Sequence, residues 1–366
     1  MTLACVVLGA ALAARAVPPA ATAGELLYLA EGNRLRRIDV ASLGTGAPRQ
    51  EIAIERAAND PHRGRDINGM VCALPDRSGR FVAGEDTGQP HPPAGWGVFD
   101  PDGTQVGRLV ATASARMPDP YGCAFDPQGR LFTTEIGDPG FGRGNGQLIL
   151  WLPPYDRFAA AEAPSPNACK IATDLGTGTG IAIDGAGRVY VASSSGFRIH
   201  RFLPPFPTSA DAAGGCGARD ATGAPMASAV QRETFAWARP QDGLLTYSGL
   251  AFAPNGHLYA ASVATGRIGE FDGEGRFVRL VLAPDSWLPP YATGTPQGLA
   301  VDAAGALYYA DLALGWKGTS LRPGPDGKLW RIRFAAGEPQ PPELLLGGLE
   351  YPDGLGFLPG TLVAPP

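Results

Sequence analysis

One short phrase recurs along the chain and constrains its fold more than any other feature. The phrase opens with a glycine and an apolar run, and then passes through an Asp or Pro and a glycine turn. It ends in an apolar residue, an aromatic residue and small residues. Clear copies occupy residues 122–135, 180–193, 249–262 and 298–311, and a looser copy occupies residues 69–85. Repeats at such a spacing are typical of propellers and other repeat arrays.

Composition agrees with a turn-rich β fold. The 366 residues include 51 glycines and 36 prolines, a share that indicates disorder in many chains. Here the glycines fall at fixed turn positions between short apolar runs, which favours an all-β structure. The net charge is −5, and the chain has no run of lysine and arginine. We therefore expect no nucleic-acid partner.

The copies can be counted as propeller blades. Each blade of a propeller is an antiparallel sheet of four strands, with strand A innermost and strand D outermost. Strand A is predicted to begin near Gly69, Gly122, Gly180, Gly249, Gly298 and Gly354. Strand C is predicted over 147–152, 197–202, 267–271 and 328–334, and strand D over 170–174, 278–282 and 343–346. Two insertions, about 203–246 and 312–327, interrupt the period.

The two ends of the chain complete one blade between them. The last copy lacks strands B, C and D, and the N-terminal segments 27–31, 35–40 and 51–54 match these three strands. We therefore predict a six-bladed β-propeller over residues 24–366, closed by pairing of the C-terminal strand with the N-terminal strands. Closure of the ring removes the exposed strand edges of an open array.

The first 23 residues are predicted to be a secretory signal. An apolar run over residues 4–14 is followed by small residues up to Ala23. This run is too short to cross a bilayer, which takes about 20 residues. We therefore expect a monomeric protein in the periplasm or outside the cell, with no membrane span.

The remaining cysteines fall into two groups. Cys169 and Cys216 lie in polar, glycine-rich and proline-rich stretches, and in an exported protein they can pair. Cys72 and Cys123 occupy inner-strand positions of consecutive copies, where we predict buried thiols packed as small apolar groups. No cysteine and histidine spacing in the chain fits a zinc site.

Acidic residues gather where strand A begins and strand B ends. Because strands alternate in direction, both positions lie on one face of a propeller, near the central channel. The carboxylates predicted there are Glu31, Glu85, Glu135, Asp311 and Asp353, and Asn68 precedes the first strand-A glycine. Such oxygen ligands suit Ca²⁺, and a cation would relieve their mutual repulsion. The alternative is that they cap backbone N–H groups or form turns.

Histidines and aromatic residues add to this face. His62 and His91 flank the first blade, and beside a carboxylate either histidine can serve as a general base. The alternative is a structural or exposed role. The aromatic residues predicted to form an apolar wall around a ligand, or to pack between blades, are Trp96, Tyr121, Tyr247, Trp316 and Tyr351. The chain has no nucleophile elbow, phosphate-binding loop or dinucleotide fingerprint.

The segment 180–192 is similar to an NHL-type repeat, and residues 25–364 resemble the six-bladed propeller superfamily that includes the SMP-30/gluconolactonase-like lactonases. The resemblance implies one divalent metal at the channel mouth, bound by a Glu before Gly-Pro, an Asn before Gly and an Asp before Gly. Asn68 and Asp353 match the last two patterns. The Glu-Gly-Pro phrase is absent, and Glu31 before Gly-Asn is the nearest phrase.

Two main hypotheses follow. The first is a hydrolase of a small ester or lactone that depends on Ca²⁺ or another divalent cation, which would polarise the carbonyl oxygen. Its metal ligands would be Asn68, Asp353 and Glu31 or Glu85, and water would be activated by Glu135, Asp311, His62 or His91. The second is a non-catalytic NHL-like propeller that binds a small molecule or a protein at the same face. A third hypothesis is that the propeller is a partner of a periplasmic redox enzyme, and only the expected periplasmic location supports it.

Overall fold

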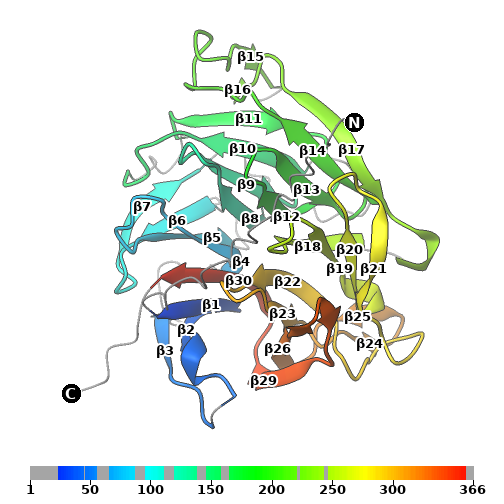
Figure 1. Ribbon diagram of the computed structural model, residues 1–366. Helices are drawn as coiled ribbons and strands as arrows, with labels where there is room; N and C mark the ends of the chain where they lie inside the picture. Colours follow the sequence, from blue (N-terminus) through cyan, green and yellow to red (C-terminus); the bar gives the residue numbers. More distant parts are fainter. Residues whose placement is uncertain are drawn as a thin grey trace, which may run out of the picture.

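The computed structural model describes residues 24–44, 46–55, 66–86, 95–110, 119–137, 146–157, 165–220, 223–242 and 246–359. Almost all of the regular structure is β-strand, and six sheets of at least four strands surround a common centre (Figure 1). Each sheet is a blade, and its strands run in the order A to D from the centre outward. His62 and His91, and the predicted signal, lie outside the described residues.

The first three blades follow the chain. Blade 1 contains β4 (Asp66–Ala73), β5 (Phe81–Asp86), β6 (Gly95–Phe99) and β7 (Gln105–Leu109). Blade 2 contains β8 (Pro120–Phe125), β9 (Leu131–Glu135), β10 (Gln147–Trp151) and β11 (Ala168–Ala172). Blade 3 contains β12 (Gly178–Ile183), β13 (Val189–Ser193), β14 (Arg198–Leu203) and β17 (Gln231–Trp237).

The last three blades include the one that joins the two ends of the chain. Blade 4 contains β18 (Thr246–Phe252), β19 (Leu258–Ser262), β20 (Arg267–Phe271) and β21 (Phe277–Leu282). Blade 5 contains β22 (Pro296–Val301), β23 (Leu307–Asp311), β26 (Gly327–Ile332) and β29 (Glu343–Leu349). Blade 6 contains β30 (Pro352–Pro359), β1 (Glu25–Glu31), β2 (Arg34–Asp39) and β3 (Gln50–Glu55).

The predicted closure of the ring is confirmed. β30 pairs with β1 in antiparallel register, from Glu25 opposite Pro359 to Glu31 opposite Pro352. In Figure 1 the red strand β30 lies against the blue strand β1. The inner strands β4, β8, β12, β18, β22 and β30 each contact the next, and β30 contacts β4. The propeller therefore has six blades and no open edge in its inner ring.

The repeated glycines are required by close contacts around the centre. A Cβ atom on any of these inner-strand glycines would lie between 1.5 and 2.8 Å from a backbone oxygen of the following blade. The pairs are Gly69 with Tyr121, Gly122 with Thr179, Gly180 with Ser248, Gly249 with Gln297, Gly298 with Asp353, and Gly354 with Gly69. Only glycine permits such an approach, so the sequence phrase records the tight packing of the inner strands.

The apolar core lies in the interfaces between blades. In β1, Leu27 and Leu29 join a cluster with Tyr308 of blade 5, whereas Tyr28 joins a cluster with Phe81 of blade 1. Successive residues of a strand point to opposite faces of its sheet. Strand B of blade 6 therefore contributes alternately to the interfaces on its two sides.

One disulfide joins two blades. Cys72 of β4 and Cys123 of β8 form a disulfide with Cα atoms 6.1 Å apart. The prediction of two buried thiols is therefore wrong. The inner strands of consecutive blades lie side by side at the centre, and equivalent positions on them come within disulfide reach.

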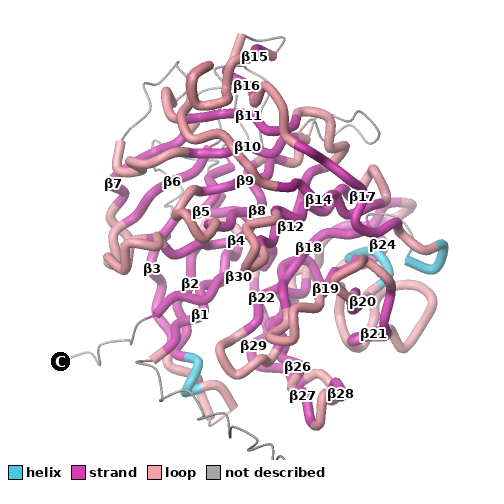
Figure 2. Tube along the Cα trace, turned by 45° about the horizontal axis from the view of Figure 1, so that its top comes forward, coloured by secondary structure: helices cyan, strands magenta, loops and turns pink. Residues whose placement is uncertain are grey.

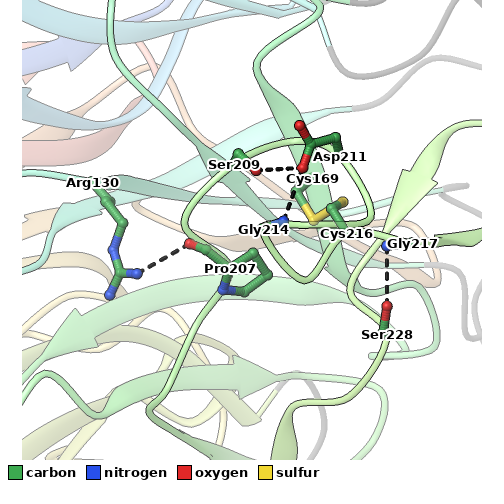
Figure 3. Close-up of a disulfide and its surroundings, with 9 residues drawn as sticks. All are labelled: Arg130, Cys169, Pro207, Ser209, Asp211, Gly214, Cys216, Gly217 and Ser228. Atoms are coloured by element: carbon green, nitrogen blue, oxygen red, sulfur yellow. Dashed lines mark hydrogen bonds between the residues drawn. A yellow bond between two sulfur atoms is a disulfide. The ribbon is translucent and has the colours of Figure 1, made fainter.

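A second disulfide fastens an insertion to blade 2. The connection between β14 and β17 carries β15 (Ala218–Arg219) and β16 (Pro225–Met226), and β16 pairs in parallel with β11 at the outer edge of blade 2. Cys216 of this connection is bonded to Cys169 of β11, the pairing that the sequence allowed (Figure 3). This arrangement covers an edge strand that would otherwise be exposed.

Hydrogen bonds within the insertion loop stabilise its conformation. Asp211 Oδ1 accepts hydrogen bonds from Ser209 Oγ at 2.6 Å and from Gly214 N at 2.8 Å, as Figure 3 shows. Arg130, from the turn between β8 and β9, donates to Pro207 O at 3.1 Å. The loop is therefore attached to blade 2 by polar contacts as well as by the disulfide.

The connections of blade 5 contain two short hairpins. The predicted insertion at 312–327 contains β24 (Gly315–Lys317) paired with β25 (Ser320–Arg322). A second hairpin, β27 (Phe334–Ala335) with β28 (Glu338–Pro339), projects beyond the sheets in Figure 2. Within the part of the chain that the structure describes, no helix has the length and apolar character needed to cross a membrane.

Candidate functional site

The predicted strand-end residues lie on one face but do not point into one channel. Side chains alternate along strand B, and its last residue takes the direction of the residues two and four positions earlier. In β1, Glu31 therefore points like Leu27 and Leu29, toward blade 5. In β23, Asp311 points like Leu307 and Tyr309, whose cluster lies on the blade 4 side. Each such side chain enters the interface with the preceding blade.

Two of the predicted calcium ligands bind arginines. Glu31 is 2% exposed, and its Oε1 accepts from Arg36 Nη2 of β2. Glu85 is fully buried, and its Oε2 accepts from Arg108 Nε at 3.3 Å and from Gln105 Nε2 at 3.1 Å. The partners lie on strands C and D of the same blades. These two carboxylates therefore already have cationic partners within their own blades.

Asp311 organises a loop. Its Oδ1 accepts from Thr295 N and Ala313 N, both at 2.7 Å, and its Oδ2 accepts from Trp330 Nε1 at 3.2 Å. The residue is fully buried. This is the backbone-capping role that the sequence left open as the alternative to metal binding.

The Asn68-Gly69 and Asp353-Gly354 phrases lie on neighbouring inner strands, β4 and β30. Asp353 of β30 is 4% exposed, and its Oδ1 accepts from Gly69 N of β4 at 3.2 Å. Tyr121 of β8 donates its hydroxyl to Asp353 O at 3.0 Å, which ties a third blade to the same point. The two motifs that carry the resemblance, Asn-Gly and Asp-Gly, are thus adjacent at the centre. Their proposed partners Glu31 and Glu85 are directed elsewhere.

Glu135 differs from the other strand-end carboxylates. It is 1% exposed, and among the described residues neither of its carboxylate oxygens has a hydrogen-bond partner. Its pKa is raised to about 8, mainly by burial; the charge of Lys170 lowers the pKa, and the charge of Asp119 raises it by a smaller amount. The residue directly opposite on β10, Gln147, also has a buried side-chain oxygen without a partner.

The described residues contain no group of three or more His, Cys, Asp or Glu side chains arranged to hold a metal ion. Of the predicted calcium ligands, Glu31 and Glu85 accept from arginines within their own blades. A calcium site formed by Asn68, Asp353 and one of these two glutamates stays a prediction.

A polar cavity of about 280 Å³ opens between blades 2 and 3. We call it the inter-blade pocket. Its polar side chains come from the connection before β12, from β13 and the turn after it, and from β14 and β17. They are Asp174, Ser193, Ser195, Arg198, His200 and Arg232. His200 lies in the segment 197–202 predicted as strand C, which was expected to lie away from the channel mouth and was given no role.

The charges of the pocket are distributed unevenly. Arg232 forms a double hydrogen bond with Asp174, with N···O distances of 2.6 and 2.9 Å. Arg198 donates from Nε to Gly196 O at 3.0 Å and stacks over the ring of Trp237 at 4.4 Å. Among the described residues no carboxylate forms an ion pair with Arg198. The pocket therefore carries one uncompensated positive charge.

The positive charges of the pocket also affect the protonation of His200. Its pKa is lowered to about 4, mainly by burial and also by the positive charges of Arg232 and Arg198, against a smaller opposite effect of Asp174. The imidazole is 6% exposed and is neutral at ordinary pH. It can therefore offer one donor and one acceptor to a ligand without adding charge.

The aromatic residues divide between the two predicted roles. Trp96, Tyr121 and Tyr247 are at most 2% exposed and pack inside the propeller. Trp316 and Tyr351 are about half exposed. Phe197, Trp237, Phe277 and Trp287 are exposed as well. Phe197 and Trp316 lie in B–C connections, Trp287 and Tyr351 lie in D–A connections, and Trp237 is the last residue of strand D of blade 3.

Comparisons with known proteins agree with the fold. No protein-family model matches the sequence, and no curated protein matches it. A nidogen/laminin complex structure is 14% identical with a TM-score of 0.54, covering 92% of this chain and 100% of that chain. A Bacteroides caccae protein of unknown function is also 14% identical, with a TM-score of 0.52 and coverage of 91% and 98%.

A calcium-binding protein, regucalcin from Agrobacterium tumefaciens, is 16% identical with a TM-score of 0.47, covering 76% of this chain and 75% of that chain. At these identities the likenesses show a shared fold alone.

Proposed function

We propose that this protein is a non-catalytic propeller that binds a small organic anion in the inter-blade pocket. The observation that carries the proposal is the state of Arg198. Its guanidinium lines a polar cavity, it is held in place by Gly196 and Trp237, and no described carboxylate pairs with it. A planar guanidinium of this kind matches the two oxygens of a carboxylate or phosphate.

Neighbouring groups would complete the recognition of an oxyanion. Ser195 Oγ accepts from Thr177 N at 2.8 Å and from Thr177 Oγ1 at 3.1 Å, so its own proton is left to donate. His200 contributes a ring N–H from the cavity wall. Trp237, 60% exposed beside Arg198, offers an apolar surface to the rest of the ligand. A charged group bound within an apolar and aromatic rim is the usual pattern of a small-molecule site.

The proposal is tested by calorimetric titration of the purified protein with acetate, benzoate and inorganic phosphate. The two carboxylates and the phosphate distinguish the possible oxyanions. We expect Arg198→Gln to weaken binding at least about tenfold, as removal of a charged hydrogen bond does. The matched control is Arg267→Gln, because Arg267 stands opposite Ser262 in blade 4 as Arg198 stands opposite Ser193 in blade 3. Absence of binding by every anion, or equal binding by Arg198→Gln, would overturn the proposal.

We also propose that the protein works outside the cytoplasm. The two disulfides, Cys72–Cys123 and Cys169–Cys216, support this location, since such bonds form and persist in oxidising compartments. Fractionation of the source cells, with detection of the protein by antibody, tests this statement directly. Recovery of the protein with reduced thiols from the cytoplasm would contradict it.

A second candidate function is hydrolysis of a small ester or lactone at the channel mouth. The contact between Gly69 N and Asp353 Oδ1 favours it, because it brings the two resemblance motifs together. The test is turnover of an ester and lactone panel with and without Ca²⁺. Asp353→Asn is the informative variant, since its side-chain oxygen can still accept from Gly69 N. Calcium-dependent turnover lost in this variant supports the candidate, and no turnover by the wild type rejects it.

A further inference from the structure

We propose that Glu135 and Gln147 form a binding site for a calcium ion at the interface of blades 1 and 2. This site is separate from the inter-blade pocket and from the channel-mouth set of Asn68 and Asp353. It shares no residue with the proposed anion site. The two proposals can therefore fail independently.

The first step of the argument is the state of the oxygens. Glu135 Oε1, Glu135 Oε2 and Gln147 Oε1 are all buried, and none accepts a hydrogen bond from a residue that the structure describes. A buried carboxylate without partners is costly, because it has lost its water and gained nothing in exchange. Few buried polar groups in native proteins lack a partner, and where no protein group serves, a bound ion or an ordered water often does.

The second step is their placement. Glu135 ends β9 and Gln147 begins β10, and the two residues are directly opposite in the antiparallel pair. Cross-strand neighbours of this kind have Cβ atoms about 5 Å apart and project from the same face of the sheet. On β9 that face also carries Leu131, which packs with Trp96 of blade 1. The three oxygens therefore share one interface, at the edge of the sheet.

The third step is charge. Asp119 lies beside the site, since its backbone oxygen accepts from Ile136 N at 2.8 Å, and it adds a second negative charge. Lys170 is the cation whose charge lowers the pKa of Glu135, but its Nζ binds Asp220 at 2.5 Å. Glu31 and Glu85, at the same position of blades 6 and 1, each have an arginine partner in their own blade. Within the described ranges no arginine pairs with Glu135 in this way, so ionisation of Glu135, which burial opposes, would need a cation from outside its blade.

The fourth step is ligand chemistry. Carboxylate and amide oxygens, without a nearby thiolate or imidazole, are the donors that Ca²⁺ prefers over transition metals. Calcium takes six to eight oxygens, so waters or backbone carbonyls would supply the rest. With few carboxylates the affinity should fall in the weak range of extracellular sites, about 10⁻⁴ to 10⁻³ M.

Terbium luminescence tests the site in the intact protein. Tb³⁺ replaces Ca²⁺ at oxygen sites and emits when a nearby tryptophan is excited. Trp151 is suitably placed, because its Nε1 donates to Thr133 Oγ1 at 2.8 Å, and Thr133 lies about 7 Å from Glu135 along β9. We expect sensitised emission that excess Ca²⁺ abolishes. We expect Glu135→Gln to reduce the affinity for Tb³⁺ at least about tenfold, since the charge of the ligands sets affinity.

The matched control is Glu85→Gln, at the equivalent position of blade 1, and circular dichroism confirms the fold of each variant. Emission retained in Glu85→Gln and lost in Glu135→Gln supports the site. Emission lost in both variants would show that the loss is not specific to Glu135 and would overturn the proposal. Absence of emission from the wild type, or emission unchanged in Glu135→Gln, would also overturn it, and a buried water would then be left to satisfy these oxygens.

Discussion

Gly354 of β30 packs against Gly69 of β4 so closely that a Cβ atom at position 354 would lie 1.5 Å from the Gly69 carbonyl oxygen. This contact joins the last inner strand to the first. Because the obstacle is backbone on both sides, a side chain cannot be accommodated by a change of rotamer. The contact therefore makes closure of the ring sensitive to a single methyl group.

We expect Gly354→Ala to lower the free energy of unfolding by about 3 kcal/mol or more, at the upper end of the cost of overpacking. Gly347→Ala is the control, since a Cβ there meets no atom within 4 Å and the substitution should change stability by less than about 0.5 kcal/mol. Urea denaturation measures both. Equal stability of the two variants would show that the inner strands are less tightly packed than the structure indicates.

The buried ion pair of Glu85 and Arg108 gives a second prediction. Their side chains are 0% and 9% exposed, so Arg108→Met removes a charged partner from a buried carboxylate and should cost about 3–5 kcal/mol. The double variant with Glu85→Gln should recover part of this loss. The exposed pair Arg34–Glu55 is the control, where Arg34→Met should cost at most about 1 kcal/mol. A double-mutant cycle with no coupling between Glu85 and Arg108 would contradict the assignment.

The disulfide between Cys72 and Cys123 gives a third prediction. It links positions 51 residues apart, and the chain-entropy treatment of the unfolded state assigns about 4 kcal/mol to a loop of this length. We expect the Cys72→Ala, Cys123→Ala double variant to lose stability on this scale. Thiol titration of the denatured, unreduced mature protein is the direct check. A free thiol at Cys72 or Cys123 would contradict the disulfide and support the buried thiols predicted from the sequence.

His200 gives a prediction about pH. Its pKa is about 4 in the folded protein and about 6.5 when exposed, so between these values the unfolded chain binds the extra proton. Stability should therefore fall as the pH is lowered from 6.5 to 4, and this part of the loss should stop below pH 4. His200→Gln should remove that contribution. The comparison is urea denaturation of both proteins across this range, and parallel curves would mean that the imidazole is not buried as described.

The inner part of the fold could be predicted in detail because the repeated phrase marks the positions of strands A and B in most blades. Gly122 and its equivalents mark the start of each inner strand, and strands B such as Leu131–Glu135 follow at a fixed distance. The outer strands carry no such mark. β11 begins two residues before the predicted position, and strand D of blade 3, β17, lies within the predicted insertion 203–246, where no strand was assigned.

The site was harder to predict, for two physical reasons. The end of strand B was placed correctly on one face, but side-chain alternation turns Glu31 and Asp311 into the interfaces between blades. The arginines that bind the carboxylates, such as Arg108, lie on other strands of the blade. Which residue of an outer strand comes beside a given carboxylate cannot be deduced from a single sequence. The inter-blade pocket could not be predicted for the same reason, since Arg198 and Arg232 come from strands C and D of one blade. The roles predicted for His62 and His91 stay predictions.

The blade shared by the two ends of the chain bears on how the protein is made. Strands β1, β2 and β3 precede all the other described strands in the chain, yet β1 pairs with β30, the last one described. During synthesis, and during any export that threads the chain from its N-terminal side, β1 remains without this partner until more than 300 further residues have been made. A protease that removed β30 from the finished protein would reopen the ring at this point, and one cut would expose strand edges on both sides of it.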